Sequence, residues 1–129
     1  MGGTELLPPM ASRLRFLIIG SSGFVGRHTL AHVRSLGFRA VGTQSRPGGT
    51  DLVPCDLRTQ RIADCVPKAF WDTDEPIIGV LCAAISQIDR CGRERALSYQ
   101  VNVAGTIRAI DDLVASGATP VFLSSDGVF

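Results

Sequence analysis

A short apolar run followed by evenly spaced glycines is the feature that most constrains how this chain folds. Leu14–Ile19 is mostly apolar, as expected of a parallel strand that is covered on both faces. Gly20, Gly23 and Gly26 come directly after it. Apolar residues at helical spacing then occupy Phe24–Leu36. A strand, a glycine-rich turn and a helix in this order predict an α/β domain built on a parallel sheet.

Each of the glycines has a physical reason to lack a side chain. Gly20 must leave the strand in a sharp turn, and at Gly26 a Cβ would clash where the first helical turn packs close to the sheet. At Gly23 a side chain would cover the amides that open the helix, and these amides form a phosphate site together with the helix dipole. The pattern departs from GxGxxG because Ser21 stands where that rule expects its first glycine. The position of the glycines between a strand and a helix nevertheless predicts a dinucleotide site. The alternative is a turn with a purely structural role.

The rest of the chain continues the alternation of strands and helices. Residues 1–12 are expected to be a disordered leader, and residues 13–129 a single domain. The prediction is a Rossmann-like, doubly wound parallel sheet with strand order 3-2-1-4-5, incomplete at the C-terminus. The later strands are predicted over Arg39–Thr43, Leu52–Pro54, Ile77–Cys82 and Val121–Ser124, and the later helices over Thr59–Phe70, with Pro67 distorting its last turn, and Gly92–Ser116.

In such a sheet, ligands bind at the carboxyl ends of the strands, where the strand order reverses. We call this end of the sheet the rim. The segments predicted to reach the rim are Gly20–Gly26, Thr43–Arg46, Cys82–Ser86 and Ser124–Ser125.

Charge is distributed unevenly along the chain, although the formal net charge is only +1. No Asp or Glu occurs between Leu6 and Thr50, while arginines stand at 13, 15, 27, 34, 39 and 46. Acidic residues outnumber basic ones from Asp51 onward. The glycine-bearing half therefore favours an anionic ligand, with a solvated charged face as the plain alternative. Nucleic acid is not expected, because the basic residues are not interleaved with aromatic ones.

Compartment and metal content are constrained by what the sequence lacks. No apolar run approaches the roughly 18 residues of a membrane span, and the N-terminus has no apolar core of a signal peptide. The cysteines at 55, 65, 82 and 91 form no CxxC pair. This pattern favours reduced thiols in the core over metal ligands or disulfides, and hence a cytoplasmic protein.

The end of the second strand bears on the choice of dinucleotide. An NAD site usually presents Asp or Glu there, which binds the ribose hydroxyls. This chain has Thr43, Ser45 and Arg46 instead, two hydroxyls and a guanidinium suited to a 2′-phosphate. NADP(H) is predicted as the preferred cofactor and NAD(H) stays open. An ordinary loop arginine is the alternative interpretation of Arg46.

Several segments together carry a resemblance to a known family. They are the glycine turn, "VPCDL", "VLCAAIS", "YQVNVAGT" and "VFLSSDGVF". From Leu14 to Phe129 the chain resembles the extended short-chain dehydrogenases/reductases of the NAD-dependent epimerase/dehydratase type, whose GxxGxxG motif the glycines match. "SSDGVF" is most similar to the "STDYVF" segment of the dTDP-4-dehydrorhamnose reductases and their sugar-nucleotide-binding relatives, although Gly127 stands where an aromatic residue is usual.

The resemblance implies roles for individual residues. Asp56 and Leu57 fall where the family's Asp-Leu pair caps the adenine. Ser125 aligns with the catalytic Ser or Thr that hydrogen-bonds the substrate oxygen, and Asn102 matches an Asn that shapes the site. Simpler alternatives are a turn residue for Asp56, a helix-surface group for Asn102 and a core thiol for Cys82. The cofactor-binding residues implied by the turn, the second strand and the family are Gly20, Ser22, Gly23, Phe24, Val25, Gly26, Thr43, Ser45, Arg46, Asp56, Leu57, Cys82, Ala83, Ala84 and Ser124.

The catalytic pair of the family is missing from these residues. Its YxxxK motif supplies a Tyr that moves the proton of the carbinol oxygen and a Lys that lowers the pKa of that Tyr. Here Tyr99 is followed four residues later by Val103, and Lys68 is the sole lysine. The chain is therefore expected to be a truncated, cofactor-binding N-terminal half of an NADP-dependent reductase or epimerase, inactive alone. Hydride would pass between the nicotinamide and a carbonyl of a nucleotide-linked sugar.

Two alternatives to this function are kept open. One is a non-catalytic NADP-binding module, similar to the regulatory subunit of methionine adenosyltransferase, which has an "SSDYVF"-like segment. The other is an early-ended product without a stable fold. If the full-length protein is a reductase or epimerase, its expected partner is a nucleotide-sugar substrate. Binding to nucleic acid or to a membrane is not expected, and a homodimer is left open.

Overall fold

The computed structural model describes residues 13–48, 51–83 and 92–123. Within these ranges a parallel sheet of five strands runs in the order β3-β2-β1-β4-β5, as predicted. The fifth strand begins two residues before its predicted start, and the predicted leader and Ser124 lie outside the described residues. The strands are β1 (Arg15–Ile19), β2 (Arg39–Gln44), β3 (Val53–Pro54), β4 (Ile77–Leu81) and β5 (Thr119–Phe122).

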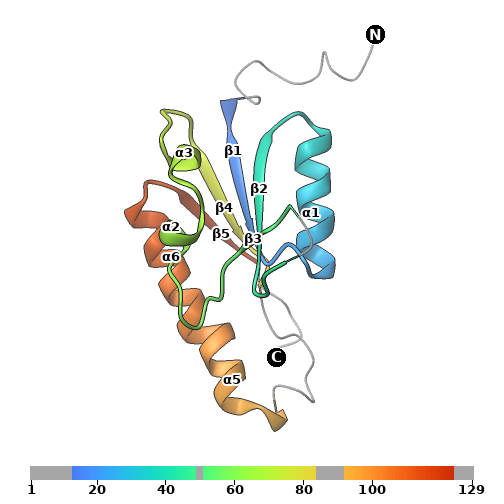
Figure 1. Ribbon diagram of the computed structural model, residues 1–129, viewed down its shortest axis with the longest axis vertical. Coiled ribbons are helices and arrows are strands. Elements are labelled where there is room, and N and C mark those ends of the chain that lie inside the picture. Colours follow the sequence, from blue (N-terminus) through green and yellow to red (C-terminus); the bar gives the residue numbers. More distant parts are fainter. Residues whose placement is uncertain (1–12, 49–50, 84–91, 124–129) are drawn as a thin grey trace.

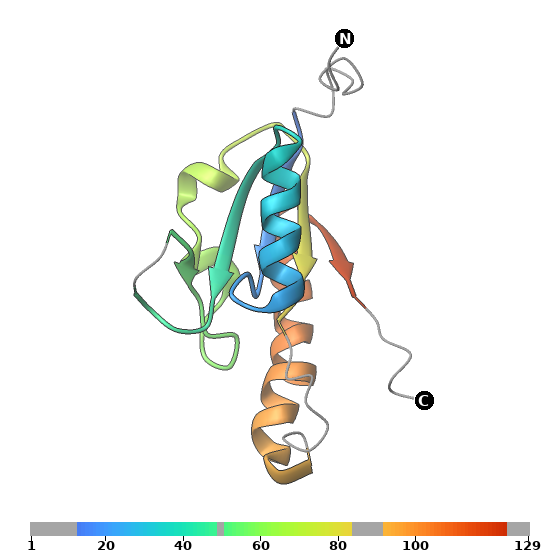
Figure 2. The same ribbon diagram turned by 90° about the vertical axis from the view of Figure 1, so that its right-hand side faces the viewer.

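Helices cover both faces of the sheet (Figure 1). Helix α1 lies on one face, and α2, α3 and α6 lie on the other. Figure 2 shows α5 extending well past the carboxyl ends of the strands. The helices are α1 (Phe24–Ser35), α2 (Ile62–Cys65), α3 (Lys68–Trp71), α5 (Arg95–Tyr99), the π-helical η3 (Gln100–Gly105) and α6 (Thr106–Ala115).

The apolar residues of β1 alternate between two cores, one on each face of the sheet. Leu17 and Ile19 pack into the larger core, which includes Leu113 of α6. Ile18 packs into the smaller core against Leu30 of α1 and Val80 of β4. Because β1 is buried on both faces, its continuous apolar sequence is explained, and the sheet is fixed in the middle of the domain.

The predicted helix over Thr59–Phe70 is wrong in its continuity. It is two one-turn helices, α2 and α3, separated by extended backbone at Val66 and Pro67, whose ψ angles are 132° and 141°. Proline has no N–H to donate, and its ring pushes the preceding residue out of the helical region. Pro67 therefore ends one helix and begins the next, rather than distorting a last turn.

The predicted helix over Gly92–Ser116 is also interrupted. Glu94 has non-helical backbone angles ahead of α5, and the π-helical η3 separates α5 from α6. The hydroxyl of Thr106 donates to the Val101 carbonyl at 3.3 Å, five residues back, which satisfies an acceptor in the widened turn. At Gly105 a Cβ would come within 3.2 Å of Leu57, so the absence of a side chain lets the helix lie close to that residue.

No helix within the three described ranges is both long enough and apolar enough to cross a membrane.

Candidate functional site

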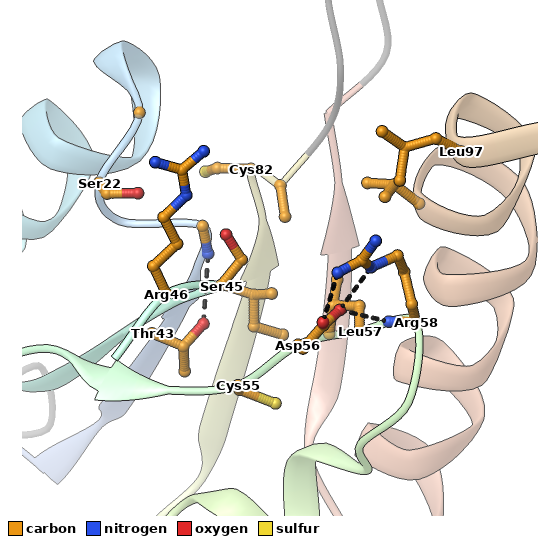
Figure 3. A pocket seen from close by; sticks show the side chains of 15 residues that line it. Ser22, Thr43, Ser45, Arg46, Cys55, Asp56, Leu57, Arg58, Cys82 and Leu97 are labelled. Atoms are coloured by element: carbon orange, nitrogen blue, oxygen red, sulfur yellow. Dashed lines mark hydrogen bonds and ion pairs between the residues drawn. The ribbon is translucent and has the colours of Figure 1, made fainter. Parts of the chain in front are cut away.

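A cavity of about 400 Å³ opens at the carboxyl ends of β1, β2 and β4, on the predicted rim (Figure 3). The glycine turn, the end of β2, the segment after β3, the end of β4 and the start of the α5–η3 helix all contribute to it. Its lining residues are Ile19, Gly20, Ser22, Gly23, Thr43, Ser45, Arg46, Cys55, Asp56, Leu57, Arg58, Cys82, Ala83, Leu97 and Val101.

Two of the motif glycines are required by the fold itself. Gly20 has a φ of +86°, and a Cβ there would lie 2.5 Å from the backbone nitrogen of Ala83. At Gly26 a Cβ would overlap the carbonyl oxygen of Gly20. The predicted clash at Gly26 is confirmed, but its partner is the turn that precedes the helix rather than the sheet.

Gly23 differs from the other two. Its backbone is extended, with φ −77° and ψ 172°, a conformation open to any residue. The nearest atom to a Cβ there would be the Gly20 carbonyl oxygen, at an ordinary 3.7 Å. Helix α1 begins at this point without a side-chain cap and without an acidic residue in its first turn. The positive end of the helix dipole therefore faces the cavity beside a position that needs no glycine for folding.

Thr43 and Ser21 hold the glycine turn in place. Thr43 is 1% exposed, and its hydroxyl accepts a hydrogen bond from the Gly20 N–H at 3.3 Å. The N–H of Ser21 donates to the Thr43 carbonyl at 2.7 Å, and its hydroxyl donates to the Ile18 carbonyl at 2.6 Å. Thr43 lines the cavity, so its predicted contact with a phosphate stays a prediction, while its role in positioning the turn is direct.

One side of the cavity is basic and hydroxylated. Figure 3 shows the guanidinium of Arg46 extending toward Ser22, with the hydroxyl of Ser45 nearby. The three side chains come from the glycine turn and from the residues just after β2, which the topology brings together. This grouping provides several hydrogen-bond donors and a positive charge for an anionic group.

The other side of the cavity holds an ion pair that the sequence analysis missed. Nε of Arg58 donates to Oδ1 of Asp56 at 3.0 Å, and Nη2 donates to Oδ2 at 2.8 Å. The backbone N–H of Arg58 adds a bond to Oδ1 at 3.0 Å. The hydrogen bond from the Arg58 side chain is the main reason that the pKa of Asp56 is lowered. The only available signal was the Asp-x-Arg spacing, which is compatible with an ordinary turn.

Part of the cavity wall is apolar. Leu57 follows Asp56, and Leu97 and Val101 face the cavity from α5 and η3. Leu97 and Val101 were also missed, although they stand four residues apart on a predicted helix and so share a face. Burial raises the pKa of the Cys82 thiol, and burial together with a hydrogen bond between the Cys55 and Cys65 thiols raises that of Cys55. Both thiols are therefore neutral wall groups.

The lining carries more positive than negative charge. Arg46 and Arg58 contribute guanidinium groups, and Asp56 is the one acidic residue among the lining residues. Other arginines of the basic half are engaged elsewhere: Arg15 pairs with Glu75 at 2.7 Å, and Arg34 pairs with Asp51 at 3.1 Å. Fewer arginines of the basic half are thus available to an anionic ligand than the sequence indicated. Among the described residues, no cluster of His, Cys, Asp and Glu could hold a metal ion.

A family model described as the NAD dependent epimerase/dehydratase family matches residues 16–129, which include the glycine turn and all five strands but for the first residue of β1. The chain belongs to the NAD dependent epimerase/dehydratase family. This confirms the family that the sequence motifs indicated. A comparison with curated proteins gave no match.

Solved structures share the fold of this epimerase/dehydratase family member over most of its length. MoeE5 in complex with UDP-glucose and NAD is 24% identical, with a TM-score of 0.73 over 89% of this chain and 38% of that chain. A dTDP-4-dehydrorhamnose reductase from Clostridium acetobutylicum is 25% identical, with a TM-score of 0.67 over 89% of this chain and 37% of that chain. A short-chain dehydrogenase/reductase superfamily protein from Agrobacterium tumefaciens with bound NAD is 30% identical, with a TM-score of 0.59 over 86% and 32%. The chain thus spans less than two fifths of the length of each of these three solved chains.

Some predicted site residues of this family member do not line the cavity. Phe24 and Val25 are exposed on the first turn of α1, and Gly26 lies against the turn. Asn102 lies in η3, and its side-chain amide donates to the Ser98 hydroxyl at 3.4 Å. The remaining predictions, Ala84, Ser124 and Ser125, lie outside the described residues.

Proposed function

We propose that this chain is the cofactor-binding part of an NADP(H)-dependent reductase or epimerase that acts on nucleotide-linked sugars. The observation that carries the proposal is Gly23: the fold does not require a glycine there, yet its open side faces a cavity at the start of an uncapped helix. A ligand that approaches the backbone explains the glycine. Pyrophosphate, bound by the amides that open α1, is the group this cradle suits.

The residues around the cavity fit the other parts of a nicotinamide dinucleotide. The apolar wall formed by Leu57, Leu97 and Val101 suits a purine ring, with Asp56 at its edge as a hydrogen-bond acceptor. The nicotinamide end is proposed to lie toward Cys82 and Ala83. The family resemblance adds Ala84 and Ser124 as proposed cofactor-binding residues and Ser125 as the proposed catalytic residue. When bound, the nicotinamide supplies or accepts the hydride, and Ser125 would polarise the oxygen of the reacting carbon.

The preference for NADP(H) rests on the end of β2. The positions at the end of β2 and just after it are Thr43, Ser45 and Arg46, and none of them offers a carboxylate that could accept hydrogen bonds from ribose hydroxyls. A carboxylate there would also repel a 2′-phosphate, whereas Arg46 attracts one. The hydroxyls of Ser22 and Ser45 flank this guanidinium and would donate to the same phosphate.

The sugar-nucleotide substrate is supported by family membership and by the solved relatives. The Clostridium acetobutylicum protein is a dTDP-4-dehydrorhamnose reductase, and MoeE5 was solved with UDP-glucose. Because the chain spans only about 38% of the MoeE5 chain, the substrate and the reaction belong to the proposal for the whole protein. The 129 residues by themselves are proposed to bind cofactor without turnover, since they contain no YxxxK pair. Reduction of a dTDP-linked ketosugar by this chain alone would contradict that.

The test is a fluorescence titration of the chain with NADPH and, separately, with NADH. Replacing Arg46→Ala should weaken NADPH binding by about tenfold and leave NADH binding unchanged, because only NADPH carries the phosphate. Arg39→Ala is the matched control, since Arg39 is an exposed arginine at the first residue of β2, whereas Arg46 follows the last residue of that strand. Equal affinities for the two cofactors, unaffected by Arg46→Ala, would remove the NADP(H) preference. No saturable binding of either cofactor would remove the proposed function.

A further inference from the structure

A side-chain hydrogen bond closes the loop that follows β2. Nε2 of Gln44, the last residue of β2, donates to the carbonyl of Gly48 at 3.2 Å. Gln44 is 9% exposed, whereas residues 45–48 are all exposed. Among the described residues, no other hydrogen bond reaches residues 45–48. The shape of this exposed loop therefore depends on a contact made by a buried side chain.

The backbone of Gln44 is itself held in place by the sheet. Its carbonyl accepts a hydrogen bond from the Cys55 N–H at 2.7 Å, and it is paired in register with Pro54 of β3. Successive side chains of a strand point to opposite faces, so Gln44 and its neighbour Thr43 diverge. Thr43 lines the cavity and Gln44 is not among the lining residues. The Gln44 amide thus acts on the loop and not on a ligand in the cavity.

The loop residues also restrict their own backbone. Pro47 fixes its own φ and disfavours the helical region for Arg46, which precedes it. Gly48 has a φ of +104°, a conformation that favours glycine. Because the carbonyl of Gly48 is also bonded to Gln44, both ends of the loop are fixed relative to β2. The loop is therefore ordered before any ligand binds.

Arg46 is the charged residue that this loop carries into the site. Its guanidinium extends toward Ser22 (Figure 3), and in the described part of the chain it has no ion pair. Arg58, by contrast, is paired with Asp56. The position of the Arg46 charge is therefore set by the backbone of the loop rather than by a carboxylate. A loop that is ordered in advance loses less conformational freedom when an anion binds.

We propose that Gln44 is a positioning residue for Arg46: its bond to the Gly48 carbonyl holds the loop in the conformation that directs the guanidinium toward a 2′-phosphate. This inference rests on the proposed function, because the phosphate is what distinguishes NADP(H) from NAD(H). Gln44 acts through Arg46 and does not touch the cofactor. Its contribution is therefore confined to the dinucleotide that carries the phosphate.

The test measures NADPH and NADH affinity by fluorescence titration of Gln44→Met, which keeps a similar volume but has no donor. NADPH should bind about three- to fivefold more weakly and NADH with unchanged affinity, because the loop is freer while the charge remains. Combined with Arg46→Ala, Gln44→Met should weaken NADPH binding no further, since both residues act on the same phosphate. A merely structural role would weaken the binding of both cofactors alike.

Gly48→Ala disturbs the same loop from its other end, and Gly37→Ala is its matched control. The φ angles of the two glycines are +104° and +89°, and a Cβ at either would meet nothing within 4 Å. Both variants should lower the melting temperature in thermal melts, because alanine is strained at a positive φ. Only Gly48→Ala should weaken NADPH binding, since Gly37 follows α1 and lies outside the loop.

Unchanged NADPH affinity in a folded Gln44→Met variant would overturn the positioning role, and so would an equal loss of NADH affinity. A further loss from Gln44→Met in the Arg46→Ala background would overturn it as well, because Gln44 would then act independently of Arg46. If Gln44→Met does not fold, the same comparisons with Gly48→Ala decide. If the unaltered chain binds neither dinucleotide, the proposed function fails, and the inference fails with it before any variant is compared.

Discussion

At the scale of single residues, the three motif glycines have different physical origins. Gly20 is fixed by a positive φ and by the neighbouring Ala83, and Gly26 by the carbonyl of Gly20. Gly23 has ordinary backbone angles and open space beside it. A sequence motif treats the three alike, so only the structure separates the residues needed for folding from the one available to a ligand.

This difference gives a prediction for alanine substitutions at Gly23 and Gly26. Gly26→Ala should lower the free energy of unfolding by about 3 kcal/mol or more, because its Cβ overlaps backbone that cannot move aside. Gly23→Ala should change it by less than about 1 kcal/mol, since a small loss at the helix start offsets a gain from the stiffer unfolded chain. NADPH affinity should nevertheless fall at least about tenfold in Gly23→Ala.

Denaturant titration and NADPH fluorescence measure the two effects on the same samples. Normal NADPH binding by a fully folded Gly23→Ala variant would show that the ligand does not approach this backbone. The unfolding of Gly23→Ala along with Gly26→Ala would show a folding requirement at Gly23 that its geometry does not indicate.

Prediction of single residues from the sequence succeeded where a rule of backbone geometry applied. It failed where a side chain forms a hydrogen bond that the sequence does not reveal. The sharp turn predicted at Gly20 and the clash predicted at Gly26 both follow from the backbone geometry of the glycine turn, although the clash at Gly26 is with the turn and not with the sheet. Thr43 was expected to face a ligand, but its hydroxyl also accepts from Gly20, a partner 23 residues away in sequence. Arg58 was overlooked because nothing in its local sequence distinguishes a fork around Asp56 from a solvated arginine.

At the scale of elements, the order of strands and helices was predictable and their continuity was not. Apolar runs and helical periodicity report which face is buried, and this determines an element's existence. One interruption arises from a single residue, because Pro67 removes a donor between α2 and α3. The other is the π-helical turn η3, which ends at Gly105, where the missing side chain lets Leu57 lie close. Periodicity over Gly92–Ser116 averages over such a turn and does not reveal it.

One buried acidic residue ties two of these elements together. Asp112 of α6 is 4% exposed, and its carboxylate accepts from the Arg61 guanidinium at 3.0 Å and from the Ala63 N–H in α2 at 3.1 Å. Because α2 is a single turn with no side-chain cap, this contact fixes its position against α6. The neighbouring Asp111 is exposed on the same helix.

Asp112→Ala should therefore lower the free energy of unfolding by about 1–3 kcal/mol, since it leaves the Ala63 N–H without its acceptor. Asp111→Ala gains the same helix propensity and loses no buried contact, so its unfolding free energy should stay within about 0.5 kcal/mol of the unaltered chain. Urea denaturation of the three proteins makes the comparison. Equal stability of the two variants would mean that α2 is not held through Asp112.

At the scale of the whole molecule, the two halves of the sequence meet across the sheet. Strands alternating with helices predicted the parallel sheet and its order, because parallel crossovers leave few topologies. Part of the positive charge of the basic half is neutralised within the fold. Arg15 of β1 donates hydrogen bonds to the Glu75 carboxylate and to the carbonyls of Ala69 and Phe70, at the opposite end of the sheet from the rim. Of the arginines in the basic half, Arg46 is the one that lines the cavity, where Arg58 from the other half joins it.

The sheet also carries an edge that the core does not protect. In the part of the chain that the structure describes, β5 pairs with β4 alone, and Figure 2 shows its other side open. Val121 is 40% exposed within β5, and Phe122 and Leu123 beside it are exposed as well. Exposed apolar residues on an unpaired strand edge favour pairing with another chain.

We therefore expect the 129-residue chain to self-associate as its concentration rises, and Val121→Lys to raise the dissociation constant at least about tenfold, because a charge at the edge opposes strand pairing. Val114→Lys is the matched control: it removes the same side chain from a 59% exposed site on the helix α6, whose backbone hydrogen bonds take no part in strand pairing. Sedimentation velocity over a concentration series measures both. A comparable effect of the two substitutions would mean that exposed apolar surface in general, and not the β5 edge, drives the association. A chain that stays monomeric at every concentration would show that the β5 edge does not pair with another chain in solution.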